Sequence, residues 1–234
     1  MDPILFYGVP EGCSFGAIVA LEWAGRPYRL CRIQMPQQVS GAAYKRLNPL
    51  GETPTFMTAA GAVFSQSQAI LHHIAATSDD PRMGPKPGQP GFDRLNEMVA
   101  FLNTSLFGGF SPLWQAVEGA TEAEKAFLIP NGRKKVRKTH GQLEALLGDR
   151  DWLVGDGPTI ADAYFAGIAR WNDFHQAFDR QEFPRLDALR ARIGQDPAVR
   201  FAHAIEHEDP AESAGGFRGH VTLEEVLEPQ ALPA

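Results

Sequence analysis

The sequence predicts an α/β N-terminal domain followed by an all-helical domain. Strand-like and helical segments alternate over the first 76 residues, a proline- and glycine-rich segment interrupts them, and only helical spacing follows. A length of 234 residues suits two unequal, compact domains. We therefore expect the following division of the chain: a first domain over residues 1–78, a linker over 79–91, a helical domain over 92–207 and a tail over 208–234.

The first domain is expected to have the order βαβαββα. Residues 3–7 are apolar and predict a strand, and residues 14–24 carry apolar side chains at helical spacing up to Gly25. A hairpin is expected where two short apolar runs, residues 53–57 and 62–64, flank an Ala-Gly turn. The remaining expected elements are a strand over 28–33, a short helix over 40–47 and a helix over 66–76.

The second domain is expected to contain helices alone. The segment from residue 77 to 91 holds four prolines, three glycines and two adjacent aspartates, which no helix continues through. Helical spacing then covers residues 92–117, 122–147, 159–174 and 184–193, with a break expected at Gly108-Gly109 and Ser111-Pro112. The proline-containing tail is expected to be weakly structured, with a short helix over residues 222–227.

Charge and cysteine content exclude several classes of function. A formal net charge of −6 gives no electrostatic reason to approach nucleic acid or an anionic membrane. No run of about 18 apolar residues and no basic leader segment occur, so a cytoplasmic protein is expected. Cys13 and Cys31 cannot build a disulfide framework or a four-ligand zinc site, and no metal is expected.

Three motifs occur in order along the chain. The first is Gly12-Cys13-Ser14, which opens the first helix after a strand that carries Tyr7. The second is NPLGETP over residues 48–54, with Gln66-Ser67 at a helix start twelve residues beyond its last proline. The third is GDGPTIADAY over residues 155–164. With the element order, they resemble the soluble glutathione transferase family over residues 3 to about 205, and the first motif is similar to the bacterial beta class.

The resemblance implies a thioredoxin-like N-terminal domain, glutathione as co-substrate and a homodimer. It also implies that Thr53 and Pro54, the latter after a cis peptide, pair with the glutathione backbone, while Gln66 and Ser67 receive its γ-glutamyl carboxylate. A helix start attracts a carboxylate in any case. Without the resemblance, Pro54 would be interpreted as a trans proline at an edge strand, and Gln66 and Ser67 as a simple N-cap. A cap and a carboxylate site at this helix start are compatible with each other.

The third motif has a structural interpretation. A threonine at a helix start can accept a hydrogen bond from a backbone N–H within the first turn, and an acidic residue three positions later can reach back to it. Thr159 and Asp162 have this spacing. We therefore expect a capping box with a folding role.

The start of the first helix is the expected place for thiol chemistry. The glutathione thiol resembles a free cysteine, with a pKa near about 8.5, and its thiolate is the nucleophile. The positive end of the helix dipole and the free N–H groups near Cys13 and Ser14 would stabilise that anion. The Cys13 thiol or the Ser14 hydroxyl could also donate a hydrogen bond to it, so both residues are catalytic candidates. Cys13 is either a reactive thiol that forms a mixed disulfide with glutathione or a small buried apolar residue. Tyr7 is a third catalytic candidate, although a tyrosine packed in the core would look the same.

Aromatic residues of the helical domain are candidates for a hydrophobic substrate pocket. The beta class has a histidine just before a G-F-[ST]-P-L run, and here Phe107 stands at that place, which makes the site more apolar. Each aromatic residue could equally belong to the helix-bundle core. The candidates are Phe107, Phe110, Trp114, Tyr164 and Trp171, with Phe174 beside them.

Three functions follow from the resemblance. The first is a glutathione transferase that activates the glutathione thiol for attack on a small hydrophobic electrophile. The second is a glutathione-dependent thiol–disulfide oxidoreductase, which depends on Cys13. The third is a non-catalytic binding protein with the same fold.

Overall fold

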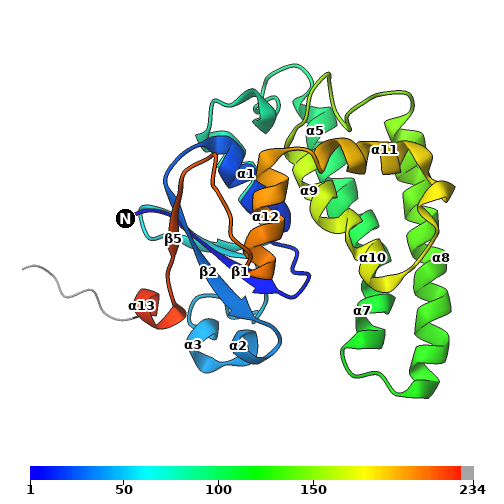
Figure 1. The fold of residues 1–234 in the computed structure, drawn as a ribbon, viewed down its shortest axis with the longest axis horizontal. Coiled ribbons are helices and arrows are strands. Elements are labelled where there is room, and N and C mark those ends of the chain that lie inside the picture. Colours follow the sequence, from blue (N-terminus) through cyan, green and yellow to red (C-terminus); the bar gives the residue numbers. More distant parts are fainter. Residues whose placement is uncertain (228–234) are drawn as a thin grey trace, which may run out of the picture.

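A computed structural model describes residues 1–227 and contains the expected α/β domain and the expected helical domain (Figure 1). The first domain has the predicted order βαβαββα. The predicted helix over residues 40–47 is in fact two one-turn helices, because Gly41 between them has an extended conformation. The elements of this domain are β1 Ile4–Val9, α1 Phe15–Ala24, β2 Tyr28–Gln34, α2 Gln37–Ser40, α3 Ala42–Lys45, β3 Thr55–Met57, β4 Val63–Ser65 and α4 Ser67–Thr77.

One five-stranded mixed sheet, in the order β4-β3-β1-β2-β5, organises this domain. β1 pairs in parallel with β2 and antiparallel with β3. Every residue of β1 is buried, which explains why its sequence is continuously apolar instead of alternating. The loop that contains Cys13 therefore begins at the end of a buried, central strand.

The fifth strand, β5 (Phe217–His220), comes from the C-terminal tail. It pairs in parallel with β2 and covers that edge of the sheet, and the short helix α13 (Leu223–Leu227) follows it. The expectation of a weakly structured tail is wrong for these residues, whereas the short helix is confirmed. The FRGH sequence of β5 gave no strand signal because the pairing with β2, a tertiary contact, defines it. The rest of the expected tail, residues 228–234, lies outside the described residues.

The second domain is helical over the described chain. The predicted break near Gly108 is confirmed, since a π-helical turn (Leu102–Leu106) and a short helix precede a new helix at Ser111. The predicted helix over 159–174 is divided in two at Arg170, and a helix over 197–207 was not predicted. The helices are α5 Phe92–Phe101, α6 Phe107–Gly109, α7 Ser111–Val117, α8 Glu122–Leu147, α9 Ile160–Ala169, α10 Trp171–His175, α11 Pro184–Ile193 and α12 Pro197–His207.

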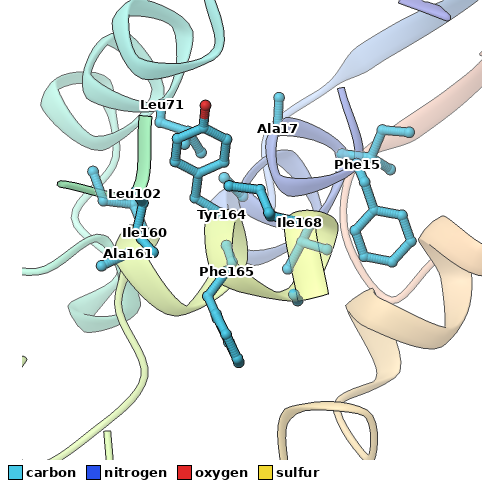
Figure 2. Packing of buried hydrophobic residues seen from close by; sticks show 14 of the residues in the cluster. Phe15, Ala17, Leu71, Leu102, Ile160, Ala161, Tyr164, Phe165 and Ile168 are labelled. Carbon is cyan, nitrogen blue, oxygen red and sulfur yellow. The ribbon is translucent and has the colours of Figure 1, made fainter. Parts of the chain in front are cut away.

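Helix α1 joins the two domains because it packs against α4 of its own domain and against α9 and α12 of the other. Two glycines allow the close approach of α1 and α9. A Cβ atom at Gly16 would lie 2.8 Å from the carbonyl oxygen of Ala163, and one at Gly167 would lie 3.2 Å from the Cβ atom of Phe15. Figure 2 shows Tyr164 of α9 beside Leu71 of α4, with Ala17 of α1 on the other side, whereas Phe165 of α9 points away from α1; all four belong to one buried apolar cluster. The start of α1 consequently lies at the domain junction.

The capping box at the start of α9 is confirmed. Asp162 accepts hydrogen bonds from the backbone N–H groups of Leu153 and Thr159 and from the Thr159 hydroxyl. Its side chain is fully buried, so these bonds replace its hydration. The box fixes the position at which α9 begins, and hence how α9 meets α1.

No helix in residues 1–227 combines the length and apolar character needed to cross a bilayer.

Candidate functional site

The loop between β1 and α1 is tightly packed on itself. A Cβ atom at Gly12 would lie 2.1 Å from the carbonyl oxygen of Gly8, so only glycine fits there. The Gly8 backbone N–H donates a hydrogen bond of 3.0 Å to the Ser14 hydroxyl, which is fully buried. Ser14 makes no side-chain cap of α1. The Ser14 hydroxyl thus fixes the loop through Gly8 and does not cap α1.

Cys13 lies where three segments of the first domain meet. Its thiol donates to the carbonyl oxygen of Thr53 at 3.1 Å, and the Ser67 hydroxyl donates to the Cys13 carbonyl oxygen at 3.1 Å. Cys13 is partly exposed, whereas Thr53 and Ser67 are buried. The start of α1, the segment before β3 and the start of α4 therefore surround one thiol.

The protonation of Cys13 differs from the sequence-based expectation. Burial raises the pKa of the Cys13 thiol, and this outweighs the Ser67 hydroxyl, the Cys13 backbone N–H and the Arg170 charge, which lower it. Glu52 adds a smaller effect that raises the pKa. The raised pKa agrees with the geometry, in which the thiol is the donor because the Thr53 carbonyl oxygen can only accept.

The Thr53–Pro54 peptide is cis, as expected. The Thr53 hydroxyl donates to the Met35 sulfur at 3.3 Å, and the Thr53 carbonyl accepts from Cys13. Within residues 1–227, the Thr53 backbone N–H donates to no other group. The segment before β3 thus offers an extended backbone with a free donor next to the thiol.

The start of α4 provides a second group of donors. Gln66 is exposed and has φ 80°, in the left-handed region, and its side chain does not cap the helix, contrary to the simple N-cap alternative. α4 begins at Ser67, so the N–H groups of its first turn lack intrahelical acceptors. These groups and the helix dipole form a favourable environment for a carboxylate.

Tyr7 lies apart from this group. Its hydroxyl makes a 3.0 Å hydrogen bond with His220 of β5 and accepts from Arg32 of β2 at 3.3 Å. The side chain is fully buried, and burial raises the pKa of the Tyr7 hydroxyl. The structure therefore brings together Cys13, Thr53, Pro54 and Ser67, with Gln66 beside them, and leaves Tyr7 with the C-terminal strand.

The predicted aromatic residues form a connected cluster, of which only part is accessible. Phe107 and Trp114 pack edge-on against Trp171, with ring centroids 5.2 and 5.3 Å away, and both are partly exposed. Phe110 and Trp171 are buried, which fits the core alternative. The Trp171 indole N–H donates to the carbonyl oxygen of Glu11 at 2.9 Å, so the cluster abuts the Cys13 loop.

Tyr164 and Phe174 differ in their surroundings. The Tyr164 hydroxyl donates to the Asn103 side-chain oxygen at 2.8 Å, and its pKa is raised by burial and, to a smaller extent, by the nearness of Cys13, whose thiolate would disfavour a second negative charge. Tyr164 is thus a buried neighbour of the thiol. Phe174 is 46% exposed and stacks on Trp114.

The sequence analysis missed two polar residues near the site. Asn103, in the π-helical turn, has no distinctive sequence signal. Arg170 has one, because it directly follows the apolar helix α9, and a charge next to such a run needs partners if it is buried. Among residues 1–227, no group of three or more His, Cys, Asp or Glu side chains is arranged to hold a metal ion.

Comparisons with known proteins agree with this architecture. The family models "Glutathione S-transferase, N-terminal domain" and "Glutathione S-transferase, C-terminal domain" match residues 12–77 and 110–197. Glutathione S-transferase GST-4.5 of Xanthomonas campestris is 32% identical over 86% of this chain and 97% of its own length.

Solved structures give the same result. A glutathione S-transferase from Xylella fastidiosa superimposes with a TM-score of 0.78 at 25% identity, covering 88% of this chain and 99% of the other. A sphingomonad glutathione S-transferase complexed with glutathione gives 0.77 at 25% identity, over 87% and 98% of the two chains. The chain belongs to the glutathione S-transferase family.

Proposed function

We propose that this transferase binds glutathione along Thr53–Pro54 and activates its thiol at Cys13, for attack on a small hydrophobic electrophile. The observation that carries this proposal is the meeting of Cys13, Thr53 and Ser67 around one thiol at the start of α1. In this placement, the glutathione cysteinyl backbone pairs with Thr53. The γ-glutamyl carboxylate accepts hydrogen bonds from the N–H groups at the start of α4, from the Gln66 side-chain amide and from the Ser67 hydroxyl.

The hydrogen bond of Cys13 supports a role in thiol activation. Cys13 donates to the same Thr53 carbonyl that the cysteinyl N–H of glutathione would take. Pairing of that N–H with Thr53 releases the Cys13 thiol, whose S–H can then donate to the glutathione thiolate. The N-terminal dipole of α1 stabilises the same anion. In this scheme, Ser14 holds the loop through Gly8 and does not touch the ligand.

The partly exposed aromatic side chains support an apolar second substrate. Phe107 and Trp114 present ring surface next to Trp171, which is bonded to the Cys13 loop. Such surface binds flat, apolar molecules. We assign the electrophile to the exposed ring surface of Phe107 and Trp114. The buried Phe110 and Trp171 pack behind this surface.

Disulfide exchange is a second candidate reaction, favoured by the partly exposed free thiol of Cys13. The Cys13 thiolate would attack the glutathione sulfur of a mixed disulfide between glutathione and a second thiol, forming a Cys13–glutathione disulfide and releasing the second thiol as its thiolate. A glutathione thiolate would then attack the glutathione sulfur bound to Cys13, releasing glutathione disulfide and regenerating the Cys13 thiolate, so that glutathione is the reductant of the overall reaction. We propose that the protein works in the cytoplasm, where glutathione is kept reduced.

A homodimer is proposed around α4 and α5. β4 is the terminal strand of the sheet, and its Val63 is 37% exposed directly before α4. The unpaired edge of β4 is open to contact with another subunit. A two-fold axis would bring α4 and α5 against their symmetry mates.

Calorimetry of glutathione binding tests the proposed site. The Gln66→Ala, Ser67→Ala double variant should bind glutathione roughly tenfold more weakly, because each lost hydrogen bond is worth about 0.5–1.5 kcal/mol. Ser40→Ala is the matched control, since its exposed hydroxyl bonds only the Gln37 carbonyl oxygen. Equal affinity of the double variant and the wild type would contradict the placement.

A further inference from the structure

The loop before Cys13 is held by two consecutive residues of the helical domain. The Arg170 guanidinium, at the end of α9, donates to the Gly12 carbonyl oxygen at 2.7 Å and forms an ion pair with the Glu11 carboxylate. The Trp171 indole N–H donates to the Glu11 carbonyl oxygen at 2.9 Å. The main chain is thereby fixed at both residues that immediately precede Cys13.

The loop needs such support because of its backbone conformation. Glu11 has φ 51°, in the left-handed region that side-chain-bearing residues seldom adopt. Conformations of this kind persist where surrounding contacts hold them. Here the contacts come from Arg170, which forms an ion pair with the Glu11 carboxylate and donates to the carbonyl oxygen of the next residue, Gly12.

Arg170 is itself held from the other side by α12. Its guanidinium donates to the Glu206 carboxylate at 3.0 Å and forms an ion pair with it at 2.8 Å. The Arg170 side chain is only 9% exposed, and its guanidinium lies 4.7 Å from the centroid of the Phe15 ring in the first turn of α1. A buried arginine whose N–H groups donate to a loop carbonyl and two carboxylates has a fixed position.

We propose that Arg170 is a positioning residue of the thiol site, which with Trp171 fixes Glu11 and Gly12 and thereby places Cys13 against Thr53 and Ser67. Glu206 is the counter-ion that holds Arg170 in place. This inference rests on the proposed function. The hydrogen bonds and ion pairs of Arg170 go to Glu11, Gly12 and Glu206, so its contacts reach Cys13 through the loop, while its charge also favours the Cys13 thiolate.

A role in positioning separates turnover from binding. The groups assigned to the glutathione backbone and carboxylate lie at Thr53 and at the start of α4, outside the reach of Arg170. A displaced Cys13 loop should therefore lower kcat and leave the KM for glutathione within about threefold. Misplacement by about 1 Å is enough to lower the rate about 100-fold.

The test compares Arg170→Met and Arg170→Lys with Arg180→Met. Arg180 is the matched control because it is also largely buried and paired with two carboxylates, those of Asp173 and Asp187, away from the site. We expect kcat for 1-chloro-2,4-dinitrobenzene conjugation to fall about 10- to 100-fold in Arg170→Met. Arg170→Lys should restore little, because one ammonium group cannot serve the three acceptors of the guanidinium fork.

Hydrogen exchange gives a readout that does not depend on glutathione. The peptide covering residues 8–14 should exchange at least tenfold faster in Arg170→Met than in the wild type, while a peptide within α8 keeps its rate. An equal acceleration of both peptides would indicate general destabilisation and would overturn the proposal. Unchanged exchange of residues 8–14, or a kcat within twofold of wild type, would overturn it as well.

A second variant guards against misfolding. Arg170→Met leaves Glu206 buried without its partner, whereas the Arg170→Met, Glu206→Met double variant replaces both charges by apolar groups and should fold. We expect the double variant to exchange as fast over residues 8–14 and to turn over as slowly as the single variant. If wild type neither binds nor conjugates glutathione, the proposed function fails, and the exchange of residues 8–14 still decides the role of Arg170.

Discussion

The Cys13 thiol donates a 3.1 Å hydrogen bond to the carbonyl oxygen of Thr53, the residue that precedes a cis proline. This bond joins the only partly exposed thiol of the described chain to the segment assigned to the glutathione backbone. The bond favours the protonated thiol, in the same direction as burial, which raises the pKa of Cys13. In the proposed binding mode, ligand binding at Thr53 and chemistry at Cys13 would be coupled through one acceptor atom.

Cys13 and Cys31 should respond differently to glutathione disulfide. Cys31 is fully buried on β2, and burial raises its pKa to about 12, so it stays a protonated thiol. Mass spectrometry after incubation should detect one glutathione per chain, on Cys13, in wild type and Cys31→Ala. Cys13→Ala should carry none and should lose disulfide reduction. Modification of Cys31 in that variant would contradict the assignment.

Tyr7→Phe should affect stability more than activity. The variant loses the hydroxyl that bonds His220 and accepts from Arg32, at a cost of about 1–2 kcal/mol in the free energy of unfolding. Urea denaturation measures this loss, and conjugation and disulfide reduction should both remain within about threefold of wild type. If Tyr7→Phe alone abolishes both reactions while Cys13→Ala and Ser14→Ala retain them, the active site has been placed wrongly.

The proposed homodimer gives a simple expectation in solution. Light scattering at micromolar concentration should report twice the 25.6 kDa of the chain. A Val63→Glu variant should shift the mass toward the monomer, because it puts a charge on the apolar edge beside α4. Phe127→Glu is the control, since Phe127 is also exposed but lies on α8. A wild-type protein with the mass of a monomer would contradict the proposed homodimer.

His140 should make stability depend on pH. Burial lowers the pKa of His140 to about 4, below the 6.5 of an exposed histidine, and its ring packs against Phe178. The unfolded chain therefore binds more protons between these values. Its contribution to stability is complete above about pH 6.5 and is lost as pH falls toward 4, by at most about 1.4 kcal/mol per unit.

Urea denaturation at several pH values measures this effect. His140→Leu should have a shallower decline of unfolding free energy between pH 6.5 and 4 than wild type. His207→Leu, a change at an exposed position, should keep the wild-type slope. Equal slopes for His140→Leu and wild type would show that His140 does not titrate as proposed.

Local patterns predicted most of the fold. Apolar spacing located α1 and α4 within one residue, with Gly25 as the stop of α1, and Thr159 with Asp162 located the start of α9. β5 escaped prediction because FRGH forms a strand only through its pairing with β2. The division at Arg170 escaped prediction because the apolar spacing continues across it and residues 168–175 contain no glycine or proline.

The site was predictable only in part. A sequence motif identifies candidate residues, but it does not show which residues lie next to them in the folded chain. The motifs placed Cys13, Thr53 and Ser67 in one family pattern, and the structure brings them into contact. Nothing in the local sequence pairs Tyr7 with His220, 213 positions away, or Arg170 with Glu11. The same limit applies to the Cys13 pKa, since burial depends on packing between the domains.

A crystal structure of this protein with glutathione tests the central claim most directly. We predict that the cysteinyl backbone of glutathione pairs with Thr53, that its γ-glutamyl carboxylate lies at the start of α4 by Ser67, and that its sulfur lies beside Cys13 at the start of α1. In that complex, the Cys13 thiol no longer donates to the Thr53 carbonyl. Glutathione bound with its sulfur beside Tyr7, or away from Thr53 altogether, would contradict the account.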